Sequence, residues 1–410
     1  MKLRRFAILT ALIFCAAAAR ADDLASQVSR AAADLKTTRK VSLKTVPPVA
    51  AVSKERYVEE YVIPELDAAW GGDFAKSLEL FKALGMVPRD LDAKAFLRQY
   101  GATMSAAAYD FLKKRILFPT DTVAPDVLLH EMVHASQDER FDIGARMLAC
   151  RGDLDRTLAM GAVFEGEALN VQLRYQAGPG RTLAGLTPYG DLRDEARAYF
   201  ERLNRGCEQW LSGVPPAVLR AQAFVYEEGV LFVERLRRRE RDWAAVDAAY
   251  KMPPRSTAQI LHPEKYLAGE WPVEMTIENK EALLRGAGCA LAAENTLGEF
   301  GIRLFLMSHG SDVDAAAKAA SGWRGDRVFL YRSDRHKSDS LVWVSAWESP
   351  ERARKAGEAL RAALGKAAII VRDADVTLLS GNGIPAVLDV KIIRKPSTEG
   401  RPLGGQDEGR

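Results

Sequence analysis

The feature that most constrains this chain of 410 residues is the run His130-Glu131-Met132-Val133-His134. In an α-helix, two histidines four positions apart lie on one face with Cβ atoms about 5–6 Å apart, so both imidazoles can hold one metal ion. Glu131 directly follows the first histidine, and its carboxylate can then reach a metal-bound water instead of the metal. The chain contains only five histidines, and this pattern should arise by chance in fewer than roughly 1 in 100 such chains. The alternative is a pair of histidines on an ordinary helix without a metal.

The residues around this run favour a helix. Pro125 suits a first helical turn, where its missing N–H costs nothing, and Asp126 suits the positive end of the helix dipole. Asp121 and Thr122 are candidate N-caps, and neither Gly nor Pro interrupts the run before Gly144. The pattern therefore predicts one helix that carries both histidines and the glutamate between them.

A metal site of this kind needs a third protein ligand, and a catalytic zinc keeps its fourth position for water. The next helix-like segment, residues 154–169, is mostly apolar between Gly161 and Ala168 but carries Glu165 and Glu167. A carboxylate buried in such a stretch needs a charge partner or a metal. Two residues that are two positions apart cannot face the same way on a helix. The spacing therefore indicates that only one of these glutamates is a ligand, the competing interpretation being a surface carboxylate.

The run Glu165-Gly166-Glu167-Ala168 resembles the Glu-Gly-x-Ala pattern of the gluzincin metallopeptidases, the thermolysin-like and aminopeptidase-like clan. In that clan the glutamate before the glycine is the third zinc ligand. The resemblance implies Zn2+ as the cofactor and Glu165 as its third ligand, with Glu167 as the runner-up or as a partner of a ligand. It also implies an α+β fold, with a mainly helical zincin-like metallopeptidase domain that contains a small β-sheet.

A closer resemblance covers more of the chain. Residues 130–142 look like the "HExxHALQDQHFDL" run of a poorly characterised group of secreted prokaryotic zinc-peptidase-like proteins. Residues 253–266 and 322–327 look like two further signatures of that group, so the resemblance extends from about residue 100 to 350. The chain departs from the commoner Leu, Gln and His of the first run at Ser136, Glu139 and Arg140. These departures should leave the metal chemistry untouched, and the resemblance implies no substrate.

A zinc hydrolase also needs a general base and a donor for the oxyanion that forms during the reaction. Glu131 is the expected base. Tyr226 and His262 are the candidate oxyanion donors; the competing interpretations are a core tyrosine with a satisfied hydroxyl and a histidine that fixes a loop. Asp138, one turn after the second histidine, is a candidate for orienting the site.

Residues 1–21 have the composition of a secretory signal peptide: basic residues, an apolar run from Phe6 to Ala19, and small residues at the cleavage positions. The apolar run is too short for an ordinary membrane span. Cleavage after Ala21 predicts a secreted or periplasmic protein with no stable membrane span. A retained N-terminal anchor is the alternative.

Cleavage changes both the charge and the cysteine count. Removing the four basic residues of the segment from the formal net charge of +3 leaves about −1, so no nucleic-acid partner is implied. Cys150, Cys207 and Cys289 remain. In an oxidising compartment two of them can pair, and we expect Cys150 and Cys207, although spacing alone does not determine connectivity.

The rest of the chain is expected to form two folded units. Residues 22–56 are interpreted as a leader and linker, 57–272 as the zincin-like catalytic domain, 290–392 as a small C-terminal α+β subdomain, and 393–410 as a disordered tail. Residues 101–110 and 115–119 predict a β-hairpin whose edge either receives an extended substrate or simply packs. Besides the helix that carries the histidines, the expected helices are 154–169, 192–203, 217–239, 242–250, 297–307, 313–320 and 348–364. Residues 257–272 are expected to be irregular, and the expected strands of the second unit are 326–331, 340–347 and 368–372.

The sequence supports two functional hypotheses. The first is an exported zinc-dependent hydrolase, a metallopeptidase acting on a peptide or protein substrate. The alternative is a non-enzymatic exported binding or structural protein whose zinc stabilises the fold. Structural zinc sites usually close with four protein ligands, often cysteines, and no fourth histidine or cysteine lies near the site in the sequence. This observation favours the hydrolase.

Overall fold

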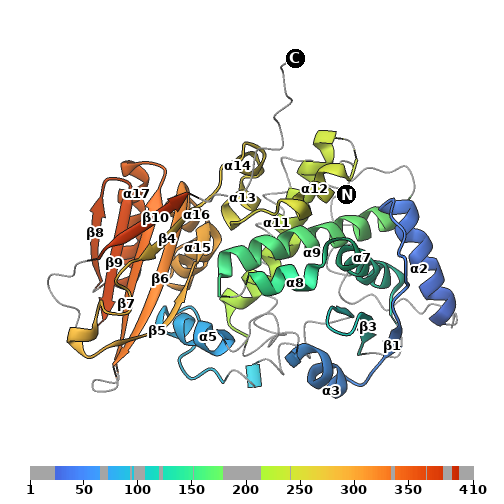
Figure 1. Ribbon diagram of the computed structural model, residues 1–410, viewed down its shortest axis with the longest axis horizontal. Coiled ribbons are helices and arrows are strands. Elements are labelled where there is room, and N and C mark those ends of the chain that lie inside the picture. The colour runs from blue at the N-terminus through green and yellow to red at the C-terminus, as the bar shows by residue number, and fades with distance from the viewer. Residues whose placement is uncertain are drawn as a thin grey trace, which may run out of the picture.

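The computed structural model of this chain has an α+β architecture, in which a mainly helical unit lies beside a five-stranded sheet with its own helices (Figure 1). The residues that the structure describes are 24–64, 73–92, 95–96, 107–119, 123–150, 152–178, 214–240, 242–333, 338–365, 367–381 and 390–396. The predicted features outside these residues are the signal peptide 1–21, residues 101–106 of the predicted hairpin, the candidate caps Asp121 and Thr122, the helix 192–203, Cys207 and residues 397–410 of the predicted tail. Cys150 and Cys289 are buried, and neither forms a disulfide with a described residue. The expected partner of Cys150 lies outside the described residues.

Three helices form the centre of the helical unit: α7 (Pro125–Phe141), α9 (Leu154–Ala177) and α11 (Pro216–Glu240). Helix α9 packs against both of the others (Figure 1). Its approach to α11 is close because two glycines meet there: a Cβ built on Gly166 would lie 2.2 Å from the backbone of Gly229. The predicted helices 154–169 and 217–239 are thus confirmed as parts of longer ones.

Shorter helices surround this centre. They are α2 (Leu24–Thr38), α3 (Lys54–Tyr57) with a following π-helical turn (Val58–Val62), α5 (Asp73–Ala83), α8 (Ile143–Ala149), α12 (Ala244–Lys251), α13 (Thr257–Leu261) and α14 (Pro263–Leu267). The last two correct the expectation that residues 257–272 are irregular. Ser256 caps α13 by accepting a hydrogen bond from the Gln259 N–H, and Pro263 occupies the first turn of α14, so each helix has its own start signal.

A three-stranded sheet lies next to α7. Strands β2 (Ala108–Asp110) and β3 (Arg115–Phe118) pair antiparallel and confirm the predicted hairpin. Strand β1 (Val49–Ala51) pairs parallel to β3 on its other side, so β2 is an edge strand of the order β1-β3-β2. Helix α2 packs against α7 and α9 (Figure 1). Residues 24–51, expected to form a leader and linker, therefore contribute a helix and a strand to the helical unit.

The C-terminal unit is built on an antiparallel sheet with the strand order β5-β6-β7-β9-β8. Its strands are β5 (Ala290–Asn295), β6 (Trp323–Ser333), β7 (Ser338–Trp347), β8 (Ala368–Arg372) and β9 (Asp375–Gly381), and its helices are α15 (Gly298–Ser308), α16 (Val313–Ala320) and α17 (Pro350–Leu364). A two-stranded ribbon joins β4 (Val273–Ile277) to β10 (Ile392–Pro396), and a 3-10 turn (Arg285–Ala287) precedes β5. All six elements predicted between residues 297 and 372 are confirmed. Strand β10 corrects the start of the predicted tail, because residues 393–396 belong to a sheet.

Two buried apolar clusters lie on opposite faces of this sheet. Val328 and Leu330 belong to the larger cluster, and the alternating residues Phe329 and Tyr331 belong to the smaller one, which the ribbon covers. The larger cluster continues without a break into the helical unit, where it includes Leu128 of α7 and other residues of α9 and α11. The two units therefore share one core. Among the described helices, none combines the length and apolar composition needed to cross a bilayer.

Candidate metal centre

Helix α7 lies in the middle of the helical unit and contains His130, Glu131 and His134 of the candidate site. It begins at Pro125, with Ala124 as an N-cap that makes no side-chain hydrogen bond. All residues from Leu128 to Asp138 are buried, which is unusual for a stretch that contains two histidines and two acidic residues. Buried polar groups need partners, and the partners of these side chains define the site.

Three side chains converge at its centre. The Nε2 atoms of His130 and His134 lie 3.3 Å and 3.5 Å from Oε2 of Glu165 on α9. One ligand atom from each of the three residues lies within 4.8 Å of the other two, so the group can hold a metal ion. The three residues expected as metal ligands are therefore brought together by the packing of α9 on α7.

Each histidine is oriented by a glutamine. The His130 Nδ1 atom lies 3.1 Å from Oε1 of Gln172, whose Nε2 donates to Asp126. The His134 Nδ1 atom lies 2.9 Å from Oε1 of Gln137. Because a glutamine oxygen only accepts hydrogen bonds, both Nδ1 atoms carry the hydrogen. In both histidines, Nε2 is then the nitrogen that faces the position where a metal would sit.

Glu131 lies in a different environment from the ligands. Its Oε2 accepts a hydrogen bond of 2.7 Å from the backbone N–H of Tyr109, on the edge strand β2. Burial raises the pKa of this carboxyl, although the positive charge of the neighbouring histidines and the Tyr109 N–H oppose the effect. A buried carboxylate with a raised pKa, beside a metal-binding group, is suited to accept and return a proton.

Asp138 supports the strand that holds Glu131. Its Oδ2 accepts a hydrogen bond of 3.0 Å from the Tyr109 hydroxyl and pairs with Lys114 in the turn of the hairpin. Asp138 thus fixes the position of β2 relative to α7. The sequence expectation that this residue orients the site corresponds to a contact with the hairpin, not with a ligand histidine.

Glu165 pairs with both histidines. Burial lowers the pKa of His134, but the adjacent Glu165 carboxylate outweighs this effect and raises the pKa to about 9. Burial likewise favours the neutral form of Glu165, yet the two histidines hold the pKa of its carboxyl well below the usual range. These shifts favour the ionised form of Glu165 and the protonated form of His134.

The structure places the two candidate oxyanion donors differently. The ring of Tyr226 on α11 lies with its centroid 6.3 Å from that of His130. His262 lies between α13 and α14, and its Nε2 is 3.0 Å from the fully buried Glu299 carboxylate, which also pairs with Arg303. Its contacts are those of a histidine that joins two parts of the fold, and it touches none of the three ligands.

Glu167, the alternative third ligand, points away from the metal group. Its carboxylate accepts hydrogen bonds from Gln137 at 3.0 Å, from Tyr250 and from Arg39. Sequence reasoning did not single out Gln137, Gln172 or Arg39. The two glutamines follow ligands at helical spacing, Gln137 by three residues and Gln172 by seven, and this regularity could have identified them. Arg39 is 128 positions from Glu167, and no local pattern indicates such a contact.

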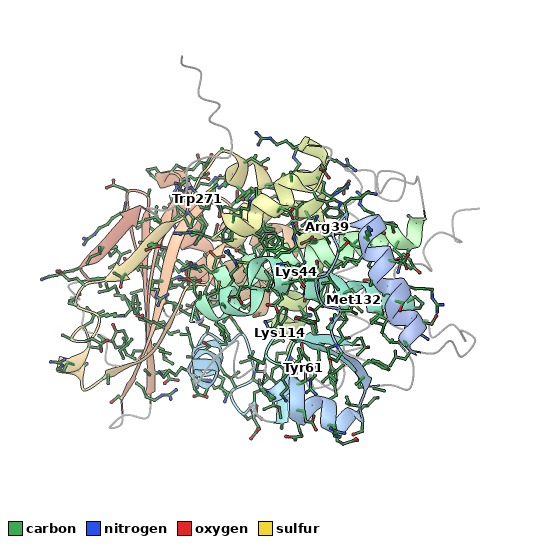
Figure 2. All side chains as sticks on the ribbon, turned by 45° about the vertical axis from the view of Figure 1, so that its right-hand side comes forward. Arg39, Lys44, Tyr61, Lys114, Met132 and Trp271 are labelled. Atoms are coloured by element: carbon green, nitrogen blue, oxygen red, sulfur yellow. The ribbon has the colours of Figure 1, made fainter. Side chains whose placement is uncertain are left out.

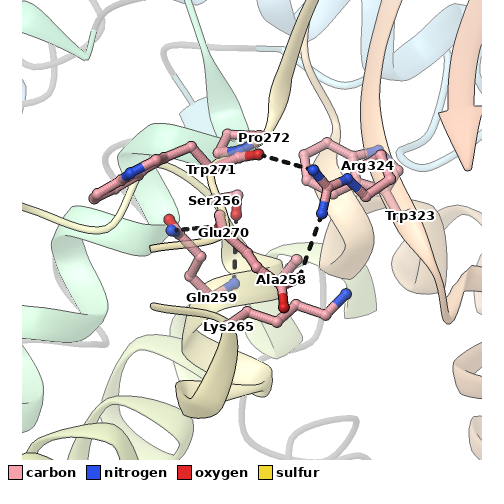
Figure 3. Close-up of a pocket in the computed structure, with 9 residues that line it drawn as sticks. All are labelled: Ser256, Ala258, Gln259, Lys265, Glu270, Trp271, Pro272, Trp323 and Arg324. Atoms are coloured by element: carbon pink, nitrogen blue, oxygen red, sulfur yellow. Dashed lines mark hydrogen bonds and ion pairs between the residues drawn. The ribbon is translucent and has the colours of Figure 1, made fainter. Parts of the chain in front are cut away.

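A shallow surface pocket lies elsewhere, where α13 and α14 meet the start of β6 (Figure 3). None of the metal-centre residues lines it. Its charged side chains are paired: Arg324 with Glu270 at 3.4 Å, and Lys265 with Glu348. The pocket therefore offers no uncompensated charge to a ligand.

Comparison with known proteins gives one match. Residues 289–387 match a family model described as "Domain of unknown function (DUF8575)". The matched segment begins just before β5 and ends beyond β9, so it corresponds to the five-stranded sheet and its helices. No curated protein and no solved structure matches the chain.

Proposed function

We propose that this protein is an exported zinc metallopeptidase. The observation that carries the proposal is the spacing of the three donor atoms. Ligand atoms about 2.0–2.2 Å from a tetrahedral zinc ion lie about 3.3–3.6 Å from one another. The separations of 3.3 Å and 3.5 Å between the histidine Nε2 atoms and Glu165 Oε2 agree with two edges of that tetrahedron.

The residues around the ligands support hydrolysis. Bound zinc supplies Lewis acidity, which makes a water molecule nucleophilic near neutral pH. Glu131 accepts a proton from that water as its oxygen attacks the carbonyl carbon, and delivers the proton to the amine nitrogen as the C–N bond breaks. Tyr226, beside His130, is the proposed donor to the oxyanion. The edge strand β2, which already donates its Tyr109 N–H to Glu131, is the proposed strand on which an extended peptide is laid.

Export is part of the proposal because of the signal-peptide composition of residues 1–21. A fold-stabilising zinc in a non-enzymatic protein is the rival hypothesis. The described residues offer the metal group three ligands, His130, His134 and Glu165. Three protein ligands leave a position for water, as catalytic sites do, whereas structural sites usually have four.

The test is elemental analysis of the mature protein, followed by a peptide-library screen. We expect one zinc ion per chain, loss of zinc in Glu165→Ala, and retained zinc without peptide cleavage in Glu131→Gln. Glu358→Gln, an exposed change on α17, is the matched control and should behave like the wild type. Zinc bound without any cleavage would support the structural rival, and a wild-type protein without metal would refute both hypotheses.

A further inference from the structure

A buried chain of hydrogen bonds connects the metal centre to the N-terminal segment. It starts at His134, passes through Gln137 and Glu167, and ends at Arg39. Arg39 directly follows helix α2 (Figure 2). The Arg39 side chain is 1% exposed and the Glu167 side chain 0% exposed. A fully buried ion pair between segments so far apart in the sequence needs an explanation beyond surface electrostatics.

The middle of this chain has only one arrangement of donors and acceptors. The Gln137 Nε2 group donates to the backbone carbonyl of Phe164 and to Glu167 Oε2, both at 3.0 Å. These two bonds use both amide hydrogens, because neither partner can donate in return. The Gln137 oxygen must then face His134, whose Nδ1 donates the hydrogen and whose Nε2 is the nitrogen left to bind a metal. The Phe164 carbonyl and the Glu167 carboxylate together fix the Gln137 amide, and through it the nitrogen that His134 presents to a metal.

Arg39 holds Glu167 in that orientation. Its Nε pairs with Oε1 of Glu167, while Tyr250 and Gln137 donate to Oε2. The other end of the guanidinium pairs with Asp247, and the whole group lies 4.4 Å from the centre of the Trp243 ring. Without this cation, a buried carboxylate must rotate to other donors or admit water. Either change removes one of the two acceptors that orient the Gln137 amide and leaves only the Phe164 carbonyl.

We propose that Arg39 is a positioning residue of the metal centre, acting on His134 through Glu167 and Gln137. This inference rests on the proposed function, since it requires that His134 bind a metal. It makes the segment before residue 57 a permanent part of the site. A second contact ties the same segment to α7: the backbone N–H groups of Lys44 and Thr45 donate to the Glu139 carboxylate at 2.9–3.3 Å.

A corresponding series of hydrogen bonds starts at His130 and provides an internal comparison. It runs through Gln172 to Asp126, which accepts a second hydrogen bond from Gln176 at 2.7 Å. Asp126 lies at the first turn of α7 and is partly exposed, so water and the helix dipole can stabilise its charge. Glu167 is fully buried in the interior of α9, so neither water nor a helix end stabilises its charge, and the Arg39 guanidinium pairs with it instead.

The experiment measures zinc affinity by chelator competition, and the visible spectrum of the cobalt-substituted protein, in a set of variants. Arg39→Gln removes the cation, and Gln137→Met removes the amide that connects Glu167 to His134. Arg140→Gln is the matched control, because Arg140 pairs with the other oxygen of Asp247 but not with Glu167. Tyr250→Phe removes one donor to Glu167 and keeps its ring stacked on Phe141, and it decides the question if Arg39→Gln does not fold.

We expect Arg39→Gln to weaken zinc binding about 10- to 100-fold and to change the cobalt spectrum. Tyr250→Phe should weaken zinc binding in the same direction, and Arg140→Gln should match the wild type. Because Arg39 acts through Gln137, the double variant Arg39→Gln/Gln137→Met should bind zinc no more weakly than Gln137→Met alone.

The proposal is overturned if Arg39→Gln and Tyr250→Phe lower the melting temperature but bind zinc like the wild type. It is also overturned if the effects of Arg39→Gln and Gln137→Met multiply. A wild type without zinc refutes the proposed function itself.

Discussion

Burial lowers the pKa of His134, but the adjacent Glu165 carboxylate raises it to about 9, so we expect His134 to be protonated at neutral pH before a metal binds. Zinc binding at neutral pH must therefore displace this proton. We expect zinc affinity to rise by about tenfold per pH unit up to about pH 9, where the proton is already absent, and then to level off. Calorimetry at pH 7 in two buffers with different ionisation enthalpies should show a released proton. A zinc affinity that does not change between pH 7 and 8 would contradict this ion pair.

Tyr226 provides a second prediction at the level of one residue. If its hydroxyl stabilises the oxyanion, Tyr226→Phe should lower kcat about 10²–10³-fold on a peptide identified by the library screen. Zinc content should remain that of the wild type, because the phenol ring beside His130 is retained. A variant with an unchanged kcat and a raised KM would instead indicate that the hydroxyl binds the ground state.

The crossing of α9 and α11 brings two residues of the site into place. Glu165 directly precedes Gly166, and a Cβ on Gly229 would lie 2.3 Å from the Ala162 carbonyl oxygen, which is too close for any real contact. Gly229→Ala should therefore push the helices apart and destabilise the protein by about 1–3 kcal/mol or more. It should also weaken zinc binding, because Glu165 and Tyr226 move with their helices. Urea unfolding and zinc competition measure the two effects.

Gly286 offers the control for that substitution. It lies in a short 3-10 turn of the C-terminal unit, and a Cβ placed on it meets nothing within 4 Å. Gly286→Ala should leave both the unfolding free energy and the zinc affinity unchanged. If Gly229→Ala is as harmless as Gly286→Ala, the helices do not depend on this close contact.

The elements that the sequence predicted are those with a strong local signal. Two short strand-like runs flank the four-residue turn Phe111–Lys114, and α7 combines Pro125 with an uninterrupted run, so local sequence determined both elements. Strand β1 has three residues, and each pairs with a residue of β3 that lies 67 positions later, so the partner strand decides its conformation. The metal group followed from helical spacing and a motif. The Arg39–Glu167 pair could not follow, because it exists only after α2 has packed on α7 and α9.

The first turn of helix α9, the helix that carries Glu165, is hydrogen-bonded to the C-terminal unit. The Leu154 N–H donates to the Asn295 side chain at 2.8 Å, and the Asp155 N–H donates to the Thr296 carbonyl at 3.2 Å. The Asp155 carboxylate in turn accepts a hydrogen bond of 2.7 Å from the Thr257 N–H. The segment matched by the family model therefore supplies acceptors that the first turn of this helix needs.

This arrangement predicts how the whole molecule unfolds. Because one apolar cluster runs from Leu128 in α7 to Trp343 in β7, the two units should unfold together in a single transition. Urea curves of the metal-free protein, followed by far-UV circular dichroism and by tryptophan fluorescence, should coincide. A chain that ends at Pro272 should lose both the shared core and the start of α9, and should bind zinc far more weakly than the full chain. Two separate transitions, or a shortened chain with full zinc affinity, would show instead that the helical unit folds without its neighbour.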